Sequence, residues 1–230
     1  MSKVVHPYAH RLVTLRDWKS RWFASKNYKN LLEGDVVIRE FLAKKLRGFY
    51  VSRVEIERNV KSTKVMVYTS RPGMIIGRSG EGATKLKNDL IAALKRRKVA
   101  IPEDFKFDIV EVTNPDADAA IVACMIAEGL EKRLPFRRVM KQTIEKVMTT
   151  RGVKGARIYL GGRLGGAEIA RSEQIKRGSI PLQTFRADVD FAREKAHMSY
   201  GDIGIKVWIY RGEVFSAQSN TPAPTGRTNK

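Results

Sequence analysis

One short segment indicates the architecture of the first half of the chain: Arg71-Pro72-Gly73-Met74-Ile75-Ile76-Gly77-Arg78-Ser79-Gly80-Glu81-Gly82. The loop Gly77-Arg78-Ser79-Gly80 separates an apolar turn from a stretch in which Leu86, Leu90 and Leu94 recur at helical spacing. Glycines at both ends of the loop allow the backbone to come close to a sugar-phosphate chain. The free N–H groups at the helix start and the arginine of the loop both attract phosphate. The segment therefore predicts a phosphate-contacting loop that opens an amphipathic helix.

The residues around this loop predict a single α+β unit. Residues 51–58 and 64–69 are rich in valine and other β-branched residues and are joined by a polar turn, which predicts a hairpin. Before them, residues 17–46 show apolar helical spacing that ends in basic residues ahead of a glycine, as helices commonly do. After the loop and its helix, residues 105–109 alternate between apolar and charged side chains, which predicts a half-buried strand.

The order of these elements is typical of a KH clamp. Strand, Ile-Ile-Gly-x-x-Gly, helix and strand on a basic chain form a groove that grips about four nucleotides. The alternative is a turn between two helices that contains two glycines. Other phosphate loops are excluded, because the spacing of Gly77, Gly80 and Gly82 reverses the dinucleotide fingerprint and no Walker-type loop occurs.

The second half predicts another α+β unit with a different plan. Residues 117–134 and 135–150 predict two helices, and residues 155–214 predict strands punctuated by glycines. The expected fold class is therefore α+β, with the second unit formed by two helices packed on a mostly antiparallel sheet. The predicted division is an extended basic arm at 1–16, a helix with the KH-type domain at 17–114, the second domain at 115–215 and a disordered tail at 216–230.

The charge of the chain points to a nucleic acid as its partner. The 230 residues carry 44 Lys plus Arg against 24 Asp plus Glu, a formal charge of +20. The excess is +7 in residues 1–48, +5 in 49–114, +6 in 115–215 and +2 in 216–230. Because the positive charge is spread over every segment, we expect the whole protein, and not just one basic arm, to be surrounded by a polyanion such as RNA or DNA.

Composition also limits the compartment. The apolar runs fall short of the roughly 18 residues that a membrane helix needs, and no secretory signal is visible at the N-terminus. A single cysteine, Cys124, excludes an intrachain disulfide. We therefore expect a cytoplasmic protein without a membrane partner.

The densest basic stretch lies between residues 132 and 163, where Glu145 is the one opposing acid. On the helix predicted to begin near Pro135, Arg137, Arg138 and Lys141 share one face because they are three and four residues apart. The alternative is an ordinary solvated face, which usually intersperses acids among its cations. Cations massed together favour a track for phosphates, which positions a strand without reading its sequence.

Catalytic chemistry is not predicted. The three histidines have no carboxylates at metal-ligand spacing, and Cys124 lies in an apolar helical stretch. Asp188 and Asp190 alternate with apolar residues, so we expect them on a solvated face, paired with Arg186 or Arg193. The sequence offers no catalytic residue, metal ligand, cofactor or small-molecule substrate, which argues against a nucleic-acid enzyme.

Several stretches of this chain resemble the bacterial form of the small ribosomal subunit protein S three family. They include Lys3-Val4-Val5-His6-Pro7, the loop segment quoted above, and Gly162-Arg163-Leu164-Gly165-Gly166-Ala167-Glu168-Ile169-Ala170-Arg171. The likeness covers residues 1–214. It implies a type II KH domain followed by the family's own C-terminal domain, in the head of the small ribosomal subunit and so in the cytoplasm.

The resemblance also implies roles for individual residues. In the family a basic helix faces the channel where messenger RNA enters, and the matching cations, Arg133, Arg137, Arg138 and Lys141, are expected to hold and help unwind mRNA. The KH loop is expected to bind RNA. The expected contacts with small-subunit rRNA are Lys3, His6, Arg11, Lys154, Arg163 and Arg171. Neighbouring proteins ten and fourteen of the same subunit, with protein two nearby, are the expected protein partners.

One other function stays open on the residues alone. A free KH-type regulator that binds single-stranded RNA would share the clamp and the basic charge. Such a protein would not travel with ribosomal particles.

Overall fold

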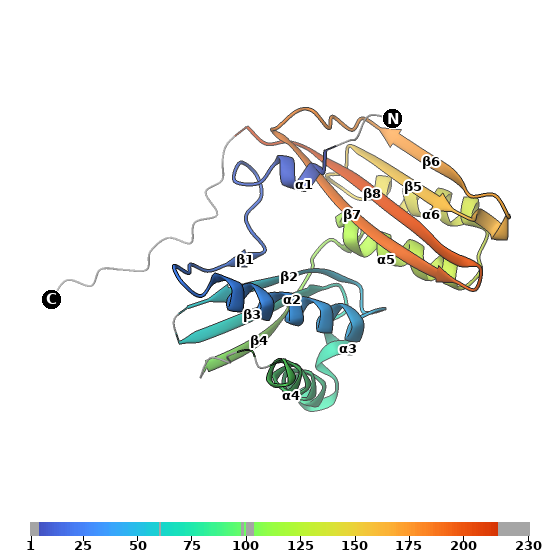
Figure 1. Cartoon of the computed structure of the whole chain (residues 1–230). Coiled ribbons are helices and arrows are strands. Elements are labelled where there is room, and N and C mark those ends of the chain that lie inside the picture. The colour runs from blue at the N-terminus through green and yellow to red at the C-terminus, as the bar shows by residue number, and fades with distance from the viewer. Residues whose placement is uncertain (1–4, 60, 98, 100–103, 216–230) are drawn as a thin grey trace.

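Two four-stranded sheets, each with its own helices, organise the chain (Figure 1). The computed structural model describes residues 5–59, 61–97, 99 and 104–215. The two sheets belong to an N-terminal α+β domain and a C-terminal α+β domain. The predicted α+β fold class is therefore confirmed.

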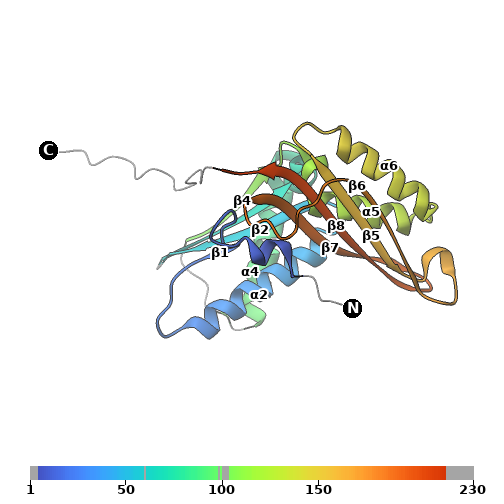
Figure 2. The same cartoon turned by 90° about the horizontal axis from the view of Figure 1, so that it is seen from above.

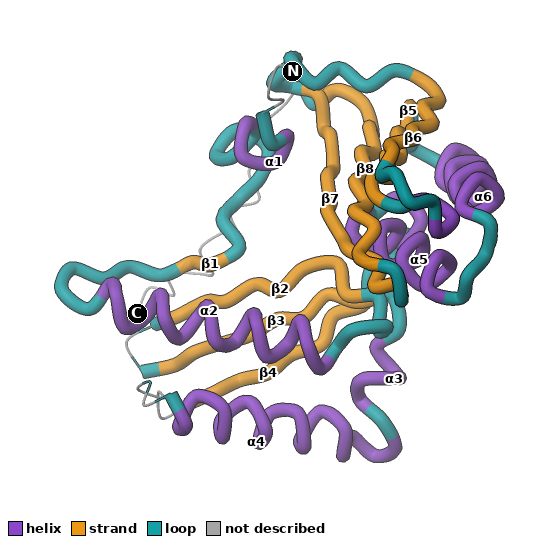
Figure 3. Tube along the Cα trace, turned by 45° about the vertical axis from the view of Figure 1, so that its right-hand side comes forward, coloured by secondary structure: helices purple, strands orange, loops and turns teal. Residues whose placement is uncertain are grey.

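The N-terminal domain has the element order expected of a KH domain. Its elements are β1 (Ser20–Arg21), α2 (Tyr28–Lys45), β2 (Val51–Arg58), β3 (Ser62–Thr69), α3 (Pro72–Ile76), η1 (Arg78–Gly80), α4 (Glu81–Arg96) and β4 (Asp104–Glu111). The strands are ordered β1-β2-β3-β4, with β2 and β3 forming the predicted antiparallel hairpin and β4 parallel to β3. Helices α2 and α4 run along this sheet (Figure 3) and bury Ile38, Leu42, Leu90 and Leu94 against it. This burial removes the apolar helix faces from water and fixes the KH loop at one end of α4.

The C-terminal domain consists of two helices on an antiparallel sheet. Its elements are η2 (Pro115–Ala117), α5 (Ala119–Glu131), α6 (Phe136–Thr149), β5 (Gly155–Gly162), η3 (Leu164–Gly166), β6 (Arg171–Gly178), β7 (Ala187–Met198) and β8 (Gly201–Glu213). The strand order is β6-β5-β8-β7, and every neighbouring pair is antiparallel. Figure 2 shows both helices on the same side of the strands, so the opposite face of the sheet carries no helix from this domain.

The N-terminal segment differs from its prediction in two ways. Residues Pro7–His10 form the short helix α1, so residues 1–16 are not an extended arm throughout. The helix predicted from residue 17 begins at Tyr28, because Ser20 and Arg21 pair in parallel with β2 instead. Figure 1 shows α1 lying against the C-terminal sheet while β1 joins the KH sheet. The segment therefore connects the two domains in space.

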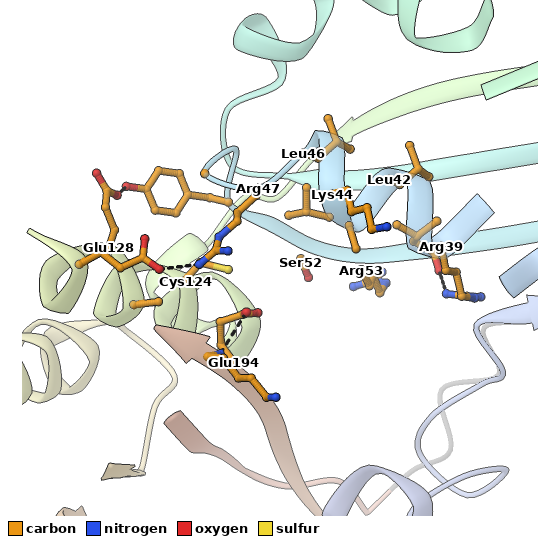
Figure 4. A pocket seen from close by; sticks show the side chains of 18 of the residues that line it. Arg39, Leu42, Lys44, Leu46, Arg47, Ser52, Arg53, Cys124, Glu128 and Glu194 are labelled. Atoms are coloured by element: carbon orange, nitrogen blue, oxygen red, sulfur yellow. Dashed lines mark hydrogen bonds and ion pairs between the residues drawn. The ribbon is translucent and has the colours of Figure 1, made fainter. Parts of the chain in front are cut away.

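A cavity of about 750 Å³ separates the two domains (Figure 4). Arg39 and Leu42 reach it from α2, and Cys124 and Glu128 reach it from α5. The walls meet at side-chain contacts, where the Tyr50 hydroxyl donates to Glu128 and the guanidinium of Arg47 pairs with Glu131. These contacts fix the end of α5 to the KH domain.

The described residues contain neither a membrane-spanning helix nor a metal cluster. No helix in these ranges combines the length and the apolar character that crossing a bilayer requires. No three histidine, cysteine or carboxylate side chains in the same ranges come together as metal ligands would. Burial raises the pKa of the Cys124 thiol to about 12, so the thiol stays protonated at neutral pH.

Candidate nucleic-acid interface

The KH loop has a backbone that depends on glycine. Gly77 adopts φ 70° and Gly80 adopts φ 80°, both in the region that L side chains rarely occupy. A Cβ atom on Gly82 would lie 2.6 Å from the Ile75 carbonyl oxygen, so α3 and α4 approach too closely for any side chain there. The Gly77 N–H donates to the Gly73 carbonyl at 3.0 Å and closes α3. The predicted tight loop is therefore present, with η1 carrying Arg78, Ser79 and Gly80 between the two helices.

The surface beside this loop is apolar and open. Met74 is 56% exposed and Ile76 37% exposed, whereas Ile75 between them is buried in the domain core. The Arg78 side chain is exposed and pairs with no carboxylate among the described residues. Apolar side chains next to a free cation suit the base and the phosphate of one nucleotide.

The second basic site lies on α6. Pro135 directly precedes this helix, whose spacing places Val139, Met140, Ile144 and Val147 in the core and the basic residues on the outer face. The side chains of Arg138 and Lys141 are exposed and have no hydrogen-bond or ion-pair partner within the described ranges. Two cations three residues apart on an open helix face are thus available to a polyanion.

Arg137 is not free in the same way. Its guanidinium pairs with Glu173 of β6 at 3.1 Å, and hydrogen bonds from Arg137 hold the pKa of that carboxyl below its ordinary value. Arg137 and Arg171 also lie over the Phe136 ring, at 5.6 Å and 5.9 Å from its centroid. Arg171, which was expected to contact rRNA, therefore lies beside the cations of α6. Glu173 adds a negative charge to this cluster, although it lies outside the basic stretch 132–163 in the sequence.

The turn before α6 holds Arg133 in an unusual conformation. Arg133 is exposed and has φ 59°, at the end of α5 where glycine is the usual residue. The preceding Lys132 pairs with Glu128 at 2.5 Å. Of the two cations in this turn, Arg133 therefore adds an exposed positive charge beside α6, whereas Lys132 is paired with Glu128.

Comparisons with known proteins agree with this geometry. The family described as "Ribosomal protein S3, C-terminal domain" matches residues 126–209, and the family described as "KH domain" matches residues 37–117. Small ribosomal subunit protein uS3 of Clostridium botulinum (strain Okra) is 46% identical over 221 residues, which is 96% of each chain. The uS3 proteins of Clostridium novyi (45%) and Clostridium acetobutylicum (46%) are similar over 215 residues, 93% of this chain and 94% of theirs.

The chain belongs to the small ribosomal subunit protein uS3 family. The KH match contains the glycine loop, and the C-terminal match contains α6 with its cations. Both candidate sites of this uS3-family chain therefore fall within regions that the family shares.

Two further expected rRNA contacts of this uS3-family chain lie on its surface. Arg163 is exposed but donates to the carbonyls of Ala167 (2.9 Å) and Tyr200 (3.2 Å), so part of its guanidinium holds the glycine turn at η3. The Lys154 side chain is exposed, while its backbone N–H donates to the Tyr210 carbonyl. Lys154 and Arg163 flank the two ends of β5.

The prediction that Arg11 contacts rRNA is wrong. Its side chain is 0% exposed and donates to the carbonyls of Pro7 (3.0 Å) and Ala187 (2.6 Å), among others. One further nitrogen donates to three more carbonyls, those of Pro181, Leu182 and Thr184. A guanidinium enclosed in this way has no surface for a phosphate, so Arg11 anchors the N-terminal segment to the C-terminal domain and does not contact rRNA.

The other N-terminal residues expected to contact rRNA have different outcomes. His6 is exposed, but its ring packs edge-on against Phe191 at 4.7 Å. Burial lowers its pKa from the ordinary value, and the charges of Arg193 and Lys19 lower it further. A neutral imidazole is a poor partner for phosphate at neutral pH. Lys3 lies outside the described residues.

Asp188 and Asp190 have partners other than those expected. Asp188 pairs with Arg16 at 2.6 Å and Asp190 pairs with Arg211 at 3.1 Å, whereas Arg186 pairs with Glu213. Both aspartates are partly buried and held in ion pairs, so they do not form the solvated outer face that was expected. Arg16 is thus a second N-terminal cation that the protein itself neutralises, and no local sequence signal marks it.

Proposed function

We propose that this uS3-family chain is a structural constituent of the small ribosomal subunit that binds small-subunit rRNA and lines the channel where mRNA enters. The observation that carries the proposal is the exposed pair Arg138 and Lys141 on α6, which pairs with no described carboxylate. Arg133 and Arg137 extend this pair along the same end of the domain. Cations without internal partners gain free energy by displacing the counterions of a nucleic-acid backbone.

In this proposal the two domains do different work. The KH loop, Gly77 to Gly80, contacts RNA through its backbone and Arg78, next to the exposed Met74 and Ile76. The α6 cations hold the incoming mRNA by its phosphates and oppose re-formation of its paired regions without ATP. The proposed role is structural and not enzymatic.

The proposal extends to domain limits and partners. Residues 1–16 form the basic N-terminal segment, 17–114 the KH domain with its leading helix, and 115–215 the C-terminal domain. The tail predicted at 216–230 lies outside the described residues. Proteins ten and fourteen of the subunit are the proposed neighbours, with protein two nearby, in the cytoplasm.

Sedimentation tests the ribosomal assignment against the free KH-type regulator. A lysate is separated on a sucrose gradient in magnesium, and the chain is followed across the fractions. The proposal expects the chain to travel with the small subunit and with whole ribosomes. A pool found mainly in the light fractions favours the regulator and contradicts the proposal.

Translation through structured mRNA tests the α6 role. We expect the triple variant Arg137→Ala, Arg138→Ala, Lys141→Ala to fold normally and to slow translation across a stable hairpin, with little effect on unstructured mRNA. The matched control removes one exposed cation from the β2–β3 turn of the KH domain, Lys61→Ala. Equal rates across the hairpin for the triple variant and the parent would contradict the role of α6.

A further inference from the structure

One face of the C-terminal sheet is not covered by α5 or α6, and the short helix α1 lies against only part of it. Alternate residues of the strands face α5 and α6, including Ile158 of β5 and Val207 of β8 in the core. Their neighbours in the strands, such as Tyr159 and Lys206, point to the other face because successive side chains alternate. Figure 1 views the sheet with α5 and α6 behind it, so this second face is the near one.

Part of this second face is already covered. Ile180 and Leu182, from the connection between β6 and β7, pack with Val189, Trp208 and Tyr210 at one end of the sheet. The N-terminal segment, which Arg11 anchors, closes the same end. The remaining part, which we call the open half, contains Gly161 of β5, Gly204 and Lys206 of β8, and Arg193 and Lys195 of β7. Tyr159 of β5 lies at its boundary, partly buried against the covered cluster.

The centre of the open half has no side chains and forms a shallow hollow. Gly161 lies opposite Gly204 in the register of β5 and β8, so neither strand places a side chain there. A Cβ atom on Gly161 would lie 3.2 Å from the Tyr159 ring, so that ring leans over the glycine. A hollow of about 480 Å³ is lined by these residues together with Arg193, Glu194, Lys195, Ile205 and Lys206. A planar group of the size of a base fits above exposed backbone and beside an aromatic ring.

The charged residues that line the hollow are mostly basic: Arg193, Lys195 and Lys206 stand against a single carboxylate, Glu194. Lys206 lies 5.4 Å from the centre of the Tyr159 ring, and it forms no ion pair with any described residue. Arg193 is likewise exposed and unpaired within the described ranges. Lys195 approaches Asp202 at 4.0 Å, but Asp202 is already bound by His197 at 2.6 Å at the end of the strand. A second row of cations, Arg157 and Lys176, continues across the sheet next to this one.

We propose that the open half is a third RNA-binding surface, at which a base of single-stranded RNA stacks on Tyr159 while its phosphates contact Lys206, Arg193 and Lys195. The site is separate from the KH loop and from α6 and does not depend on either. RNA fits better than an acidic protein segment, because an aromatic ring over a side-chain-free hollow offers a stacking position that carboxylates do not use. A four-stranded sheet with aromatic and basic side chains on its open face is also a recurrent way to bind single strands.

Cross-linking and affinity test this surface in the purified full-length chain. The KH loop is disabled by Arg78→Asp and Ser79→Asp, and the probe is an oligouridine of twelve nucleotides that contains 4-thiouridine. We expect ultraviolet cross-links on β5 or β8 near Tyr159. We also expect Tyr159→Leu combined with Lys206→Gln to weaken binding roughly tenfold, since stacking and one phosphate contact are both lost.

Matched variants separate a binding role from a folding role. Tyr159→Phe keeps the ring and is expected to bind within about twofold of the parent, because stacking does not need the hydroxyl. Lys61→Gln removes the same charge elsewhere and is expected to change nothing. Polyglutamate of equal charge is expected to compete far less well than oligouridine.

Two results would overturn the proposal. One is unchanged affinity in the Tyr159→Leu, Lys206→Gln chain with cross-links confined to other elements. The other is equal competition by polyglutamate, which would indicate a surface for acidic protein. Neither result bears on sedimentation with the small subunit, so the failure of this surface and the failure of the proposed function are distinguishable.

Discussion

The N-terminal segment and helix α6 are both rich in cations, yet the fold uses those cations in opposite ways. Arg11 is fully buried among carbonyl oxygens, and Arg16 pairs with Asp188. On α6, Arg138 and Lys141 are exposed, with no partner among the described residues. Basic residues thus either stabilise the fold or remain available to a ligand. Which of the two applies depends on whether residues far away in the sequence provide hydrogen-bond or ion-pair partners.

The difference predicts that stability and RNA binding separate between the two regions. A cation enclosed by the protein contributes to folding, because its loss leaves buried acceptors without donors. A cation without partners contributes little to folding and leaves its charge for a ligand. Substitutions in the two regions are therefore expected to change different measured quantities.

Replacement of Arg11 is expected to have the largest effect on stability. In Arg11→Met, the carbonyls that receive its hydrogen bonds, among them those of Ala187 and Thr184, lose their donor in a buried site. We expect the free energy of unfolding to fall by roughly 3 kcal/mol, measured by urea denaturation. Arg138→Met is the matched control and is expected to leave the midpoint unchanged. A stable Arg11→Met chain with weakened RNA binding would reverse the roles assigned to the two regions.

Replacement of the free α6 cations is expected to act on RNA affinity alone. For Arg138→Ala with Lys141→Ala, two phosphate contacts are lost, so the slope of log affinity against log salt should become shallower by about 1.4. Titrations of labelled single-stranded RNA at several salt concentrations measure this slope. An unchanged slope would show that these two residues do not contact phosphate.

Arg137 lies between the two cases, because Glu173 pairs with its exposed guanidinium. Glu173→Gln removes the carboxylate that pairs with Arg137 at 3.1 Å and frees the guanidinium. We expect RNA binding to become tighter and its salt slope steeper by up to about 0.7, one additional phosphate contact. The same substitution in a chain that also carries Arg137→Ala should have a smaller effect. If the two effects are equal, Glu173 acts on binding by general repulsion and not through Arg137.

His6 offers the smallest test, within the N-terminal segment. Its pKa is lowered by burial and then by Arg193 and Lys19, so the folded state prefers the neutral ring. This contribution is present above the unfolded pKa of about 6.5 and is lost as the pH falls through the lower folded value. Hydrogen exchange of the amides of residues 8–11, corrected for intrinsic rates, should therefore speed up below pH 6.5. In His6→Asn this acid response should be absent, and its persistence would assign it to another group.

Local sequence patterns predicted most of the fold. The glycine loop, the β2–β3 hairpin and helices α4, α5 and α6 were all marked by periodicity and turn residues close to them in sequence. The start of α2 was misplaced because residues 17–27 are held by the pairing of Ser20 and Arg21 with β2, a contact more than thirty residues away. Periodicity carries no information about such pairing.

The candidate site was less predictable for the same reason. The exposed face of α6 followed from its own spacing, so Arg138 and Lys141 were correctly expected on the surface. The burial of Arg11 depends on carbonyls about 170 residues later in the chain, and the pairing of Arg137 depends on Glu173 in another strand. A count of charges along the sequence treats all of these cations alike.

Arginine labelling with phenylglyoxal compares the two regions directly. The free chain and the assembled small subunit are labelled under the same conditions, and modified peptides are quantified by mass spectrometry. We expect Arg138 to be labelled in the free chain and protected in the subunit, and Arg11 to be unlabelled in both. Rapid labelling of Arg11 in the free chain, or equal labelling of Arg138 in both states, would contradict the roles assigned to the two residues.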